Sequence, residues 1–237
     1  MSAATKAKKV LIIVTSHGEM GASGKPTGVW LEELAIPYLA LKRAGVEPEV
    51  VSIRGGRLPI DPISVQPNGE NPPDIEEFLV SATREGLLSA SRPLSEVDLA
   101  RFDAVFFPGG HGTMWDFPND PRVGRVVAAF LSEQKPVAAV CHGPAALVGA
   151  RFANGTPVVQ GREVSGFTNS EERAAGLMEV VPFALETRLE ELGAHVKKGP
   201  DFKPFALKDG LLVTGQNPAS SARVVELLIE ALREQAA

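Results

Sequence analysis

Residues 136–144, Pro-Val-Ala-Ala-Val-Cys-His-Gly-Pro, place the lone cysteine of the chain, Cys141, where an apolar run ends. The run from Pro136 to Val140 is continuously apolar, which is typical of a parallel strand buried on both faces. Gly143 and Pro144 indicate that a helix starts directly after the cysteine. This order of strand, cysteine and helix resembles a nucleophile elbow, a tight turn that exposes a reactive atom above the edge of a parallel sheet.

Apolar runs alternate with helical patterns on both sides of this stretch. The predicted strands are 10–14, 49–53, 104–107, 136–140, 194–196 and 211–214, and the predicted helices are 29–44, 120–130, 183–192 and 221–232. This alternation predicts an α/β fold, a mostly parallel sheet with helices on both faces. Ligands in such sheets bind beyond the carboxyl ends of the strands. We expect a flexible N-terminus at 1–9 and a single domain at 10–237.

Local signals predict how several elements begin and end. Gly45 is expected to cap the first helix, and Pro37 to bend it. Asp120-Pro121 has the order favoured at a helix start, and Ser221 is expected to cap the last helix. Val158-Val159 and Val164, on either side of Gly161, suggest a small hairpin. The long segment 54–98 is rich in turn residues, with helical patches near 74–81 and 93–99.

Composition excludes several classes of protein. The chain of 237 residues is 44% hydrophobic and 22% charged, which is ordinary for a globular domain. Its net charge of −5 offers no basic field for nucleic acid. No apolar stretch is longer than six residues, whereas a membrane span needs about 20. No signal peptide is recognised, and a lone cysteine suits a reducing compartment. We expect a cytoplasmic protein that binds neither nucleic acid nor membrane.

The setting of Cys141 favours a reactive nucleophile over an inert buried thiol, because a helix N-terminus promotes the thiolate. His142 is placed to be its proton partner if a carboxylate orients the imidazole. Glu171 and Glu172 are the candidates for that carboxylate, although a solvated pair in a first helical turn is an equal explanation. Periodicity alone does not decide whether Glu32 or Glu33 faces inward.

The run Pro108-Gly109-Gly110-His111-Gly112 ends another strand at the same sheet edge. Its glycines allow backbone N–H groups to approach a ligand, and an oxyanion can be held by the Gly110 and His142 amides, with His111 beside the substrate. A plain tight turn is the alternative. His17 and His195 are interpreted as surface or structural residues. No cysteine or histidine spacing fits a zinc site, so a metal is not expected.

Taken in order, these motifs resemble the ThiJ/PfpI superfamily, and further stretches resemble its branch of glyoxalase III and chaperone proteins. The match extends over nearly the whole chain after about Lys9. The stretches that carry it are Thr27 to Glu33, Pro108 to Thr113, Ala138 to Pro144, Gly166 to Glu172 and Val213 to Ser220.

The resemblance implies a flavodoxin-like sandwich, usually a homodimer, that converts methylglyoxal to D-lactate without glutathione or cofactor. It implies that Cys141 is the nucleophile, that Glu33 lies beside the thiol, and that His142 and Glu172 complete a Cys-His-Glu triad. Asn169 stands where some relatives have aspartate. One of Cys141 and Glu33 is expected to stay protonated, and Glu33 with a raised pKa is the favoured choice.

Other functions stay open at this point. A glutamine amidotransferase is disfavoured, since it needs a late His-x-Glu pair and the only such pair here is His17-Gly18-Glu19. Members of the superfamily are also described as chaperones, protein deglycases and peptidases. A holdase chaperone or a deglycase would have unfolded or glycated proteins as partners. Cys141 can also be interpreted as a redox sensor that oxidises to sulfinic acid.

Overall fold

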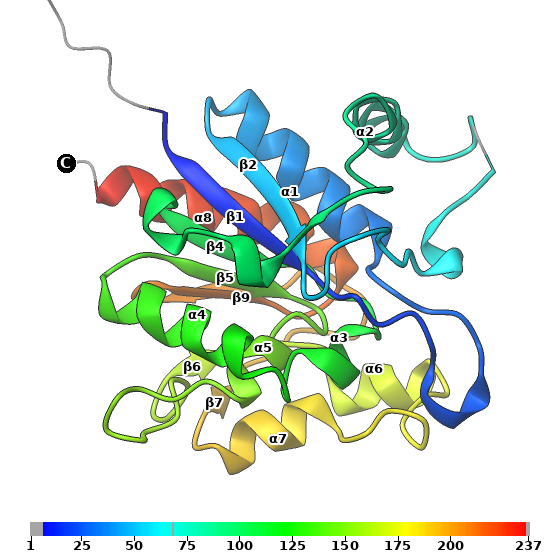
Figure 1. Cartoon of the computed structure of the whole chain (residues 1–237). Helices are drawn as coiled ribbons and strands as arrows, with labels where there is room; N and C mark the ends of the chain where they lie inside the picture. The colour runs from blue at the N-terminus through cyan, green and yellow to red at the C-terminus, as the bar shows by residue number, and fades with distance from the viewer. Residues whose placement is uncertain (1–6, 68, 236–237) are drawn as a thin grey trace, which may run out of the picture.

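The computed structural model describes residues 7–67 and 69–235. A seven-stranded sheet crosses its centre in the order β3-β2-β1-β4-β5-β9-β8 (Figure 1). Every pairing in this sheet is parallel except that of β8 with β9. The strands are β1 (Lys9–Val14), β2 (Glu47–Ser52), β3 (Arg92–Pro93), β4 (Ala104–Phe107), β5 (Val137–Val140), β8 (Ala206–Asp209) and β9 (Leu212–Gly215), and a separate parallel pair is formed by β6 (Glu163–Val164) and β7 (His195–Val196).

Helices cover both faces of the sheet (Figure 1). One face carries α1 (Leu31–Arg43), α2 (Pro73–Arg84) and α8 (Ser221–Glu234), and the other carries α4 (Pro121–Ser132), α5 (Ala145–Val148) and α7 (Leu185–Glu191). Shorter helices are α3 (Thr113–Asp116) and α6 (Asn169–Ala174), with 3₁₀ turns at Gly21–Ser23, Pro62–Ser64, Leu94–Glu96, Leu99–Arg101 and Pro218–Ser220. The predicted flavodoxin-like α/β sandwich is confirmed.

The two covered faces explain why the central strands are continuously apolar. In β1, Val10, Ile12 and Val14 pack into the core beneath α1 and α8, whereas Leu11 and Ile13 pack into the core beneath α4 and α5. Successive side chains of a strand point to opposite faces, so a strand covered on both sides needs apolar residues at every position.

Two predicted helix boundaries are confirmed by their caps. Gly45 follows α1 with φ of 74°, a left-handed conformation that glycine adopts without strain. The Asp120 side chain accepts a hydrogen bond of 2.9 Å from the Arg122 N–H at the start of α4. Helix α1 continues through Pro37 to its predicted end.

Two local predictions are wrong. Residues 158–164 do not form a hairpin; Glu163–Val164 instead pairs in parallel with His195–Val196, so a long-range contact replaces the local one. Ser221 does not cap α8, because Ser220 holds the N-cap position and the Ser221 hydroxyl donates to the Pro218 carbonyl at 2.7 Å.

The segment 54–98 contains more structure than its turn-rich composition suggests. The predicted helical patch near 74–81 is confirmed as α2, and the patch near 93–99 is resolved into two short 3₁₀ turns. Strand β3 was not predicted, because two residues carry no periodicity. The predicted flexible N-terminus at 1–9 is wrong at its end, because Lys9 is the first residue of β1 and pairs with Glu47 of β2. Residues 1–6 lie outside the described residues.

The strand order places the carboxyl ends of β1, β4 and β5 side by side. The chain builds outward from β1 through β2 to β3 and then crosses to the opposite side with β4, so β1 and β4 flank the point where the order reverses. Ligand sites in open α/β sheets lie at this crevice. Within 7–67 and 69–235, no helix has the length and apolar character needed to cross a bilayer.

Candidate active site

Cys141 lies at a sharp turn between β5 and α5. Its φ is 60°, a left-handed conformation that is rare for a residue with a side chain, and its side chain is buried. The Gly143 N–H donates to the Val140 carbonyl at 2.7 Å and closes the turn. A Cβ at Gly143 would lie 2.1 Å from the Phe107 carbonyl oxygen, so only glycine fits there. This is the geometry of a nucleophile elbow, as the sequence predicts.

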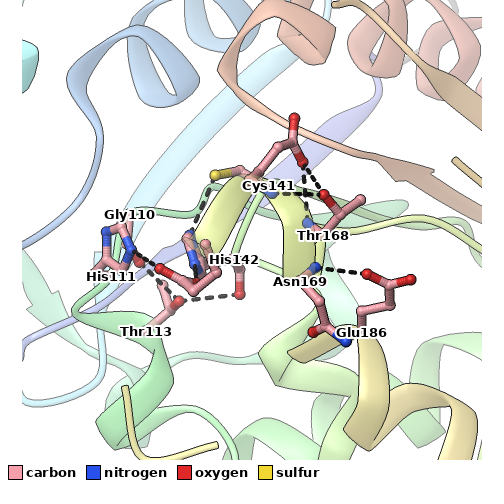
Figure 2. Close-up of polar contacts among 10 residues, drawn as sticks. Gly110, His111, Thr113, Cys141, His142, Thr168, Asn169 and Glu186 are labelled. Atoms are coloured by element: carbon pink, nitrogen blue, oxygen red, sulfur yellow. Dashed lines mark hydrogen bonds and ion pairs between the residues drawn. The ribbon is translucent and has the colours of Figure 1, made fainter. Parts of the chain in front are cut away.

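A chain of polar contacts leads away from the cysteine sulfur (Figure 2). His142 Nδ1 lies 3.3 Å from Cys141 Sγ, and His142 Nε2 lies 2.7 Å from Glu172 Oε2. The other oxygen of Glu172 lies 2.8 Å from His111 Nε2, so one carboxylate bridges two imidazoles. Both rings are buried, with centroids 4.1 Å apart. Cys141, His142 and Glu172 thus stand in the order of a thiol, a base and an orienting acid.

The contacts of His142 determine its tautomer. Nε2 faces a carboxylate oxygen and must donate, which leaves the Nδ1 lone pair directed at the sulfur. Burial, followed by the neighbouring His111, lowers the pKa of His142. A neutral imidazole with a free lone pair is the form that can accept a proton from the thiol.

Glu171 and Glu172 are both buried, so the interpretation of a solvated charge pair is wrong for each. Burial opposes ionisation of Glu172, but the imidazoles of His142 and His111 outweigh it and hold the pKa of Glu172 below its usual range. Glu171 does not contact either histidine. Its carboxylate accepts hydrogen bonds from the Thr168 N–H and hydroxyl, the Phe202 N–H, Gln216 Nε2 and Asn217 Nδ2.

We expect Glu171→Gln to destabilise the protein, because an amide would direct N–H groups at donors that now bind a carboxylate. Each buried donor left without an acceptor costs about 1–3 kcal/mol, so the free energy of unfolding should fall by about 3 kcal/mol or more. Urea titration measures it. Glu172→Gln is the matched control, and we expect it to lose turnover more than stability. Equal free energies of unfolding for the two variants would contradict the assignment of a structural role to Glu171 and a catalytic role to Glu172.

Glu33 places a second buried carboxyl beside the cysteine. It is fully buried on α1, whereas its neighbour Glu32 is half-buried, so the structure resolves which of the two faces inward. Glu33 Oε2 accepts a hydrogen bond of 2.7 Å from the Gly109 N–H, and the Cys141 thiol lies beside the same carboxyl. Burial raises the pKa of Glu33 to about 8, against the opposing effect of these hydrogen bonds.

The pKa of the Cys141 thiol is raised, contrary to the expectation from sequence, although the backbone N–H of His142 at this turn lowers it. Helix α5 has only four residues and starts beyond the turn, so its dipole is small. Burial, followed by the adjacent charge of Glu33, raises the pKa of Cys141. Because both groups favour their neutral forms, the pair retains a proton at neutral pH, and the two groups titrate together.

The loop Pro108–Gly112 follows β4 and lies against the elbow. Gly110 has φ of 96°, and a Cβ there would lie 2.2 Å from the Gly28 carbonyl oxygen, so the position requires glycine. Within the described residues, the Gly110 and His142 N–H groups donate to no backbone or side-chain oxygen. The Gly110 amide is thus open to a ligand, whereas the His142 amide faces the Cys141 sulfur, where the reacting atom of a substrate would bind.

The structure brings together a set of possible metal ligands that sequence spacing did not reveal. The ligand atoms of His111, His142 and Glu172 lie within 4.8 Å of one another. The three residues are far apart in the chain, so no short motif connects them. Both nitrogens of His142 already face Cys141 and Glu172, and a bound cation would have to displace these contacts.

The remaining residues singled out from sequence lie away from the reaction centre. His17 stacks on Trp115 with centroids 5.2 Å apart, and its Nε2 lies 2.6 Å from the Glu19 carbonyl oxygen. His195 is exposed on β7. The Asn169 N–H donates to Glu186 at 2.6 Å, which supports the first turn of α6 (Figure 2).

A cavity of about 250 Å³ opens above Cys141. Its floor is formed by Gly110, His111, Cys141 and His142, and its walls are mostly apolar. Sequence analysis missed these walls because they come from five separate segments: Met20, Trp30, Ile63, Phe167, Ala175, Leu177, Phe202 and Pro218. The reactive groups therefore lie at the base of an apolar pocket, a usual setting for a small-molecule site.

Comparison with known proteins agrees with this geometry. A family model described as the DJ-1/PfpI family matches residues 26–231. The chain belongs to the DJ-1/PfpI family. The resemblance carried by the elbow and its neighbouring motifs is thereby confirmed.

Relatives within the DJ-1/PfpI family align along nearly their whole length. Glyoxalase 3 of Candida albicans is 30% identical over 231 residues, 94% of this chain and 98% of that protein. The crystal structure of glyoxalase III from Candida albicans superposes with a TM-score of 0.85 at 29% identity, covering 94% of this chain and 97% of that one. The rapid encystment protein of Francisella tularensis superposes with a TM-score of 0.91 at 37% identity, covering 95% and 99%.

Proposed function

We propose that this protein is a glutathione-independent glyoxalase, a cofactor-independent lyase that converts methylglyoxal and related 2-oxoaldehydes to 2-hydroxy acids, D-lactate in the case of methylglyoxal. The observation that carries the proposal is the contact of the Cys141 thiol with both a neutral His142 and a buried Glu33. The names of the curated relatives, glyoxalase 3 among them, support the same activity.

In the first step, His142 Nδ1 accepts the thiol proton while the Cys141 sulfur attacks the aldehyde carbon. The product is a hemithioacetal, with one new S–C bond and negative charge on the former aldehyde oxygen. The Gly110 and His142 amides bind that oxygen. Glu172 stabilises the imidazolium that forms, as the third member of the triad, through its hydrogen bond to Nε2.

In the second step, a proton moves from the former aldehyde carbon to the adjacent carbonyl carbon through an enediol. Glu33 or His142 carries this proton, and a carboxyl with a pKa of about 8 can both donate and accept near neutral pH. The first carbon is oxidised to a thioester and the second is reduced to an alcohol. No external oxidant or reductant is needed.

In the last step, water attacks the thioester and His142 acts as the general base. The C–S bond breaks, Cys141 is regenerated, and the acid leaves. The overall reaction adds one water to the 2-oxoaldehyde. His111 lies at the cavity floor with Nε2 on Glu172, which places it to bind the substrate oxygen next to the reacting carbons.

The test is the formation of lactate by the purified protein from methylglyoxal in buffer free of glutathione and other thiols. We expect lactate to appear in proportion to the methylglyoxal lost, and D-lactate to predominate. Loss of methylglyoxal without lactate would indicate simple scavenging by protein side chains and would contradict the proposal. A holdase role would instead be favoured by suppression of client aggregation that survives the loss of Cys141.

We expect activity to survive removal of metal ions, because the proposed steps use only side chains and backbone amides. Dialysis against a strong chelator should leave the rate of lactate formation unchanged. The control is the same enzyme dialysed without chelator. Loss of activity that one divalent ion restores would assign a metal to the cluster of His111, His142 and Glu172 and overturn the cofactor-free mechanism.

The oligomeric state and the cellular location are also proposals. We propose that the protein is a homodimer and that it works in the cytoplasm. Light scattering of the purified chain measures the oligomeric state. Fractionation of the cells that produce it measures the location. A monomer at micromolar concentration would contradict the first proposal.

A further inference from the structure

The cavity above Cys141 is strongly apolar for a site that binds a reactive carbonyl compound. Within the described residues, no lysine or arginine lines it. Asp61 is the one carboxylate on its wall, but Oδ1 accepts the Ile63 N–H at 3.0 Å and Oδ2 accepts the Thr27 hydroxyl at 2.8 Å. The walls therefore offer neither a charge nor a free carboxylate to a substituent of the substrate, and they favour an apolar one.

Aromatic rings surround the reaction centre. The Phe167 ring centroid lies 4.4 Å from that of His142 and 6.1 Å from that of His111. The Phe202 ring lies 6.3 Å from Phe167 in an edge-on arrangement. Aromatic groups prefer tilted and edge-on contacts at these spacings, so an added ring would continue the same packing.

Phe202 is held in a strained backbone conformation. It is 50% exposed, yet its φ is 56°, in the left-handed region that bulky residues rarely adopt. Its N–H donates to the buried Glu171 carboxylate at 2.8 Å, and the other donors to Glu171 hold that carboxylate in place. A strained and exposed aromatic residue fixed at the rim of a cavity points to a role in binding.

We propose that the cavity selects 2-oxoaldehydes with an uncharged aryl substituent, of which phenylglyoxal is the simplest, and that Phe202 determines this preference. The inference rests on the proposed glyoxalase function and names its substrate class. The aldehyde carbon is attacked by Cys141, and the aryl group packs against Phe167 and Phe202. The reaction balances as before: phenylglyoxal plus water gives mandelate, with one carbon oxidised and its neighbour reduced.

The first test compares substrates on the wild-type protein, with mandelate and lactate measured as products. A single methylene in an apolar pocket changes kcat/KM by about 10–200-fold, so phenylglyoxal should exceed methylglyoxal by at least about tenfold. A polyhydroxylated 2-oxoaldehyde such as 3-deoxyglucosone should be the poorest of the three. Equal or faster turnover of methylglyoxal would overturn the inference and leave the glyoxalase function intact. If no 2-oxoaldehyde gave product, the proposed function itself would fail.

The second test uses variants of Phe202 with a matched control. Phe202→Leu and Phe202→Ala should lower kcat/KM for phenylglyoxal by about tenfold more than they lower kcat/KM for methylglyoxal. Val80 is 60% exposed on α2 and lies outside this cavity, so Val80→Ala should change neither rate. An equal fall for both substrates in the Phe202 variants would show that Phe202 supports the fold without selecting substrate.

Discussion

Replacing Cys141 by serine is expected to abolish the conversion of methylglyoxal to lactate. Serine has the shape of cysteine with a smaller side-chain atom, so it can take the place of Cys141 in the elbow without a new contact. A serine hydroxyl beside His142 is a far weaker nucleophile than a thiolate at the same position, so attack on the aldehyde should stop. Lactate formation by the purified variant is the measurement.

Thermal unfolding of Cys141→Ser serves as the control and should match that of the wild-type protein. A folded variant without activity assigns the loss to the nucleophile. Retention of even about a tenth of the wild-type rate would remove Cys141 from that role, since removal of a covalent nucleophile costs several orders of magnitude in enzymes that use one.

The second large effect is expected for Glu33→Gln. Glutamine keeps the shape of the side chain and can still accept the Gly109 N–H bond, but it carries no transferable proton. Alkylation of Cys141 by iodoacetamide should therefore persist, whereas turnover should fall by roughly 10²–10⁴-fold, the usual range for loss of a general acid and base. Both rates are measured on the same preparation.

Glu32→Gln is the matched control for this variant. Glu32 is adjacent in sequence and half-buried, and it does not contact the Gly109 amide that binds Glu33. We expect its turnover to stay near the wild-type rate. Normal turnover of Glu33→Gln, with loss in Glu32→Gln, would contradict the assignment of the proton carrier.

Glu33 also predicts how stability depends on pH. Burial raises its pKa from 4.5 to about 8, so the folded protein binds this proton more tightly than the unfolded chain. The resulting stability is present in full below pH 4.5 and is lost as the pH rises through 8. Glu33→Gln stays neutral, so its free energy of unfolding should vary less over this range. Equal pH dependence for the two proteins would contradict the raised pKa.

The fold could be predicted because its main signals are local. A continuous apolar run indicates a strand covered on both faces, and Gly45 and Asp120 mark helix ends through their own backbone or side-chain bonds. The wrong prediction of a hairpin at 158–164 concerns a strand whose pairing partner is far away in the chain. Glu163–Val164 pairs with His195–Val196, and nothing near residue 163 specifies that partner.

The site could be predicted only in part from the residues themselves. The elbow at Cys141 is a local motif, but the choice of Glu33 over Glu32 came from the family resemblance. Glu171 shows why such choices are difficult. It is as buried as Glu172, yet it organises the loops around Phe202 while Glu172 binds the histidines. Adjacent residues of identical chemistry differ here only through their tertiary contacts.

The pKa of Cys141 was predicted in the wrong direction for a physical reason. A helix start in the sequence suggests a dipole, but its effect depends on helix length, and α5 has only four residues. Burial depends on the packing of other segments, which no local pattern reveals. The coupled proton of Cys141 and Glu33 is thus a property of the folded site.

Titration of the protein with iodoacetamide tests the central claim most directly. At each step, peptide mass spectrometry gives the fraction of Cys141 alkylated, and the same sample is assayed for lactate formation from methylglyoxal without glutathione. Our account predicts that activity falls in direct proportion to alkylation and reaches zero when Cys141 is fully modified. Lactate formation that persists after complete alkylation of Cys141 would contradict it.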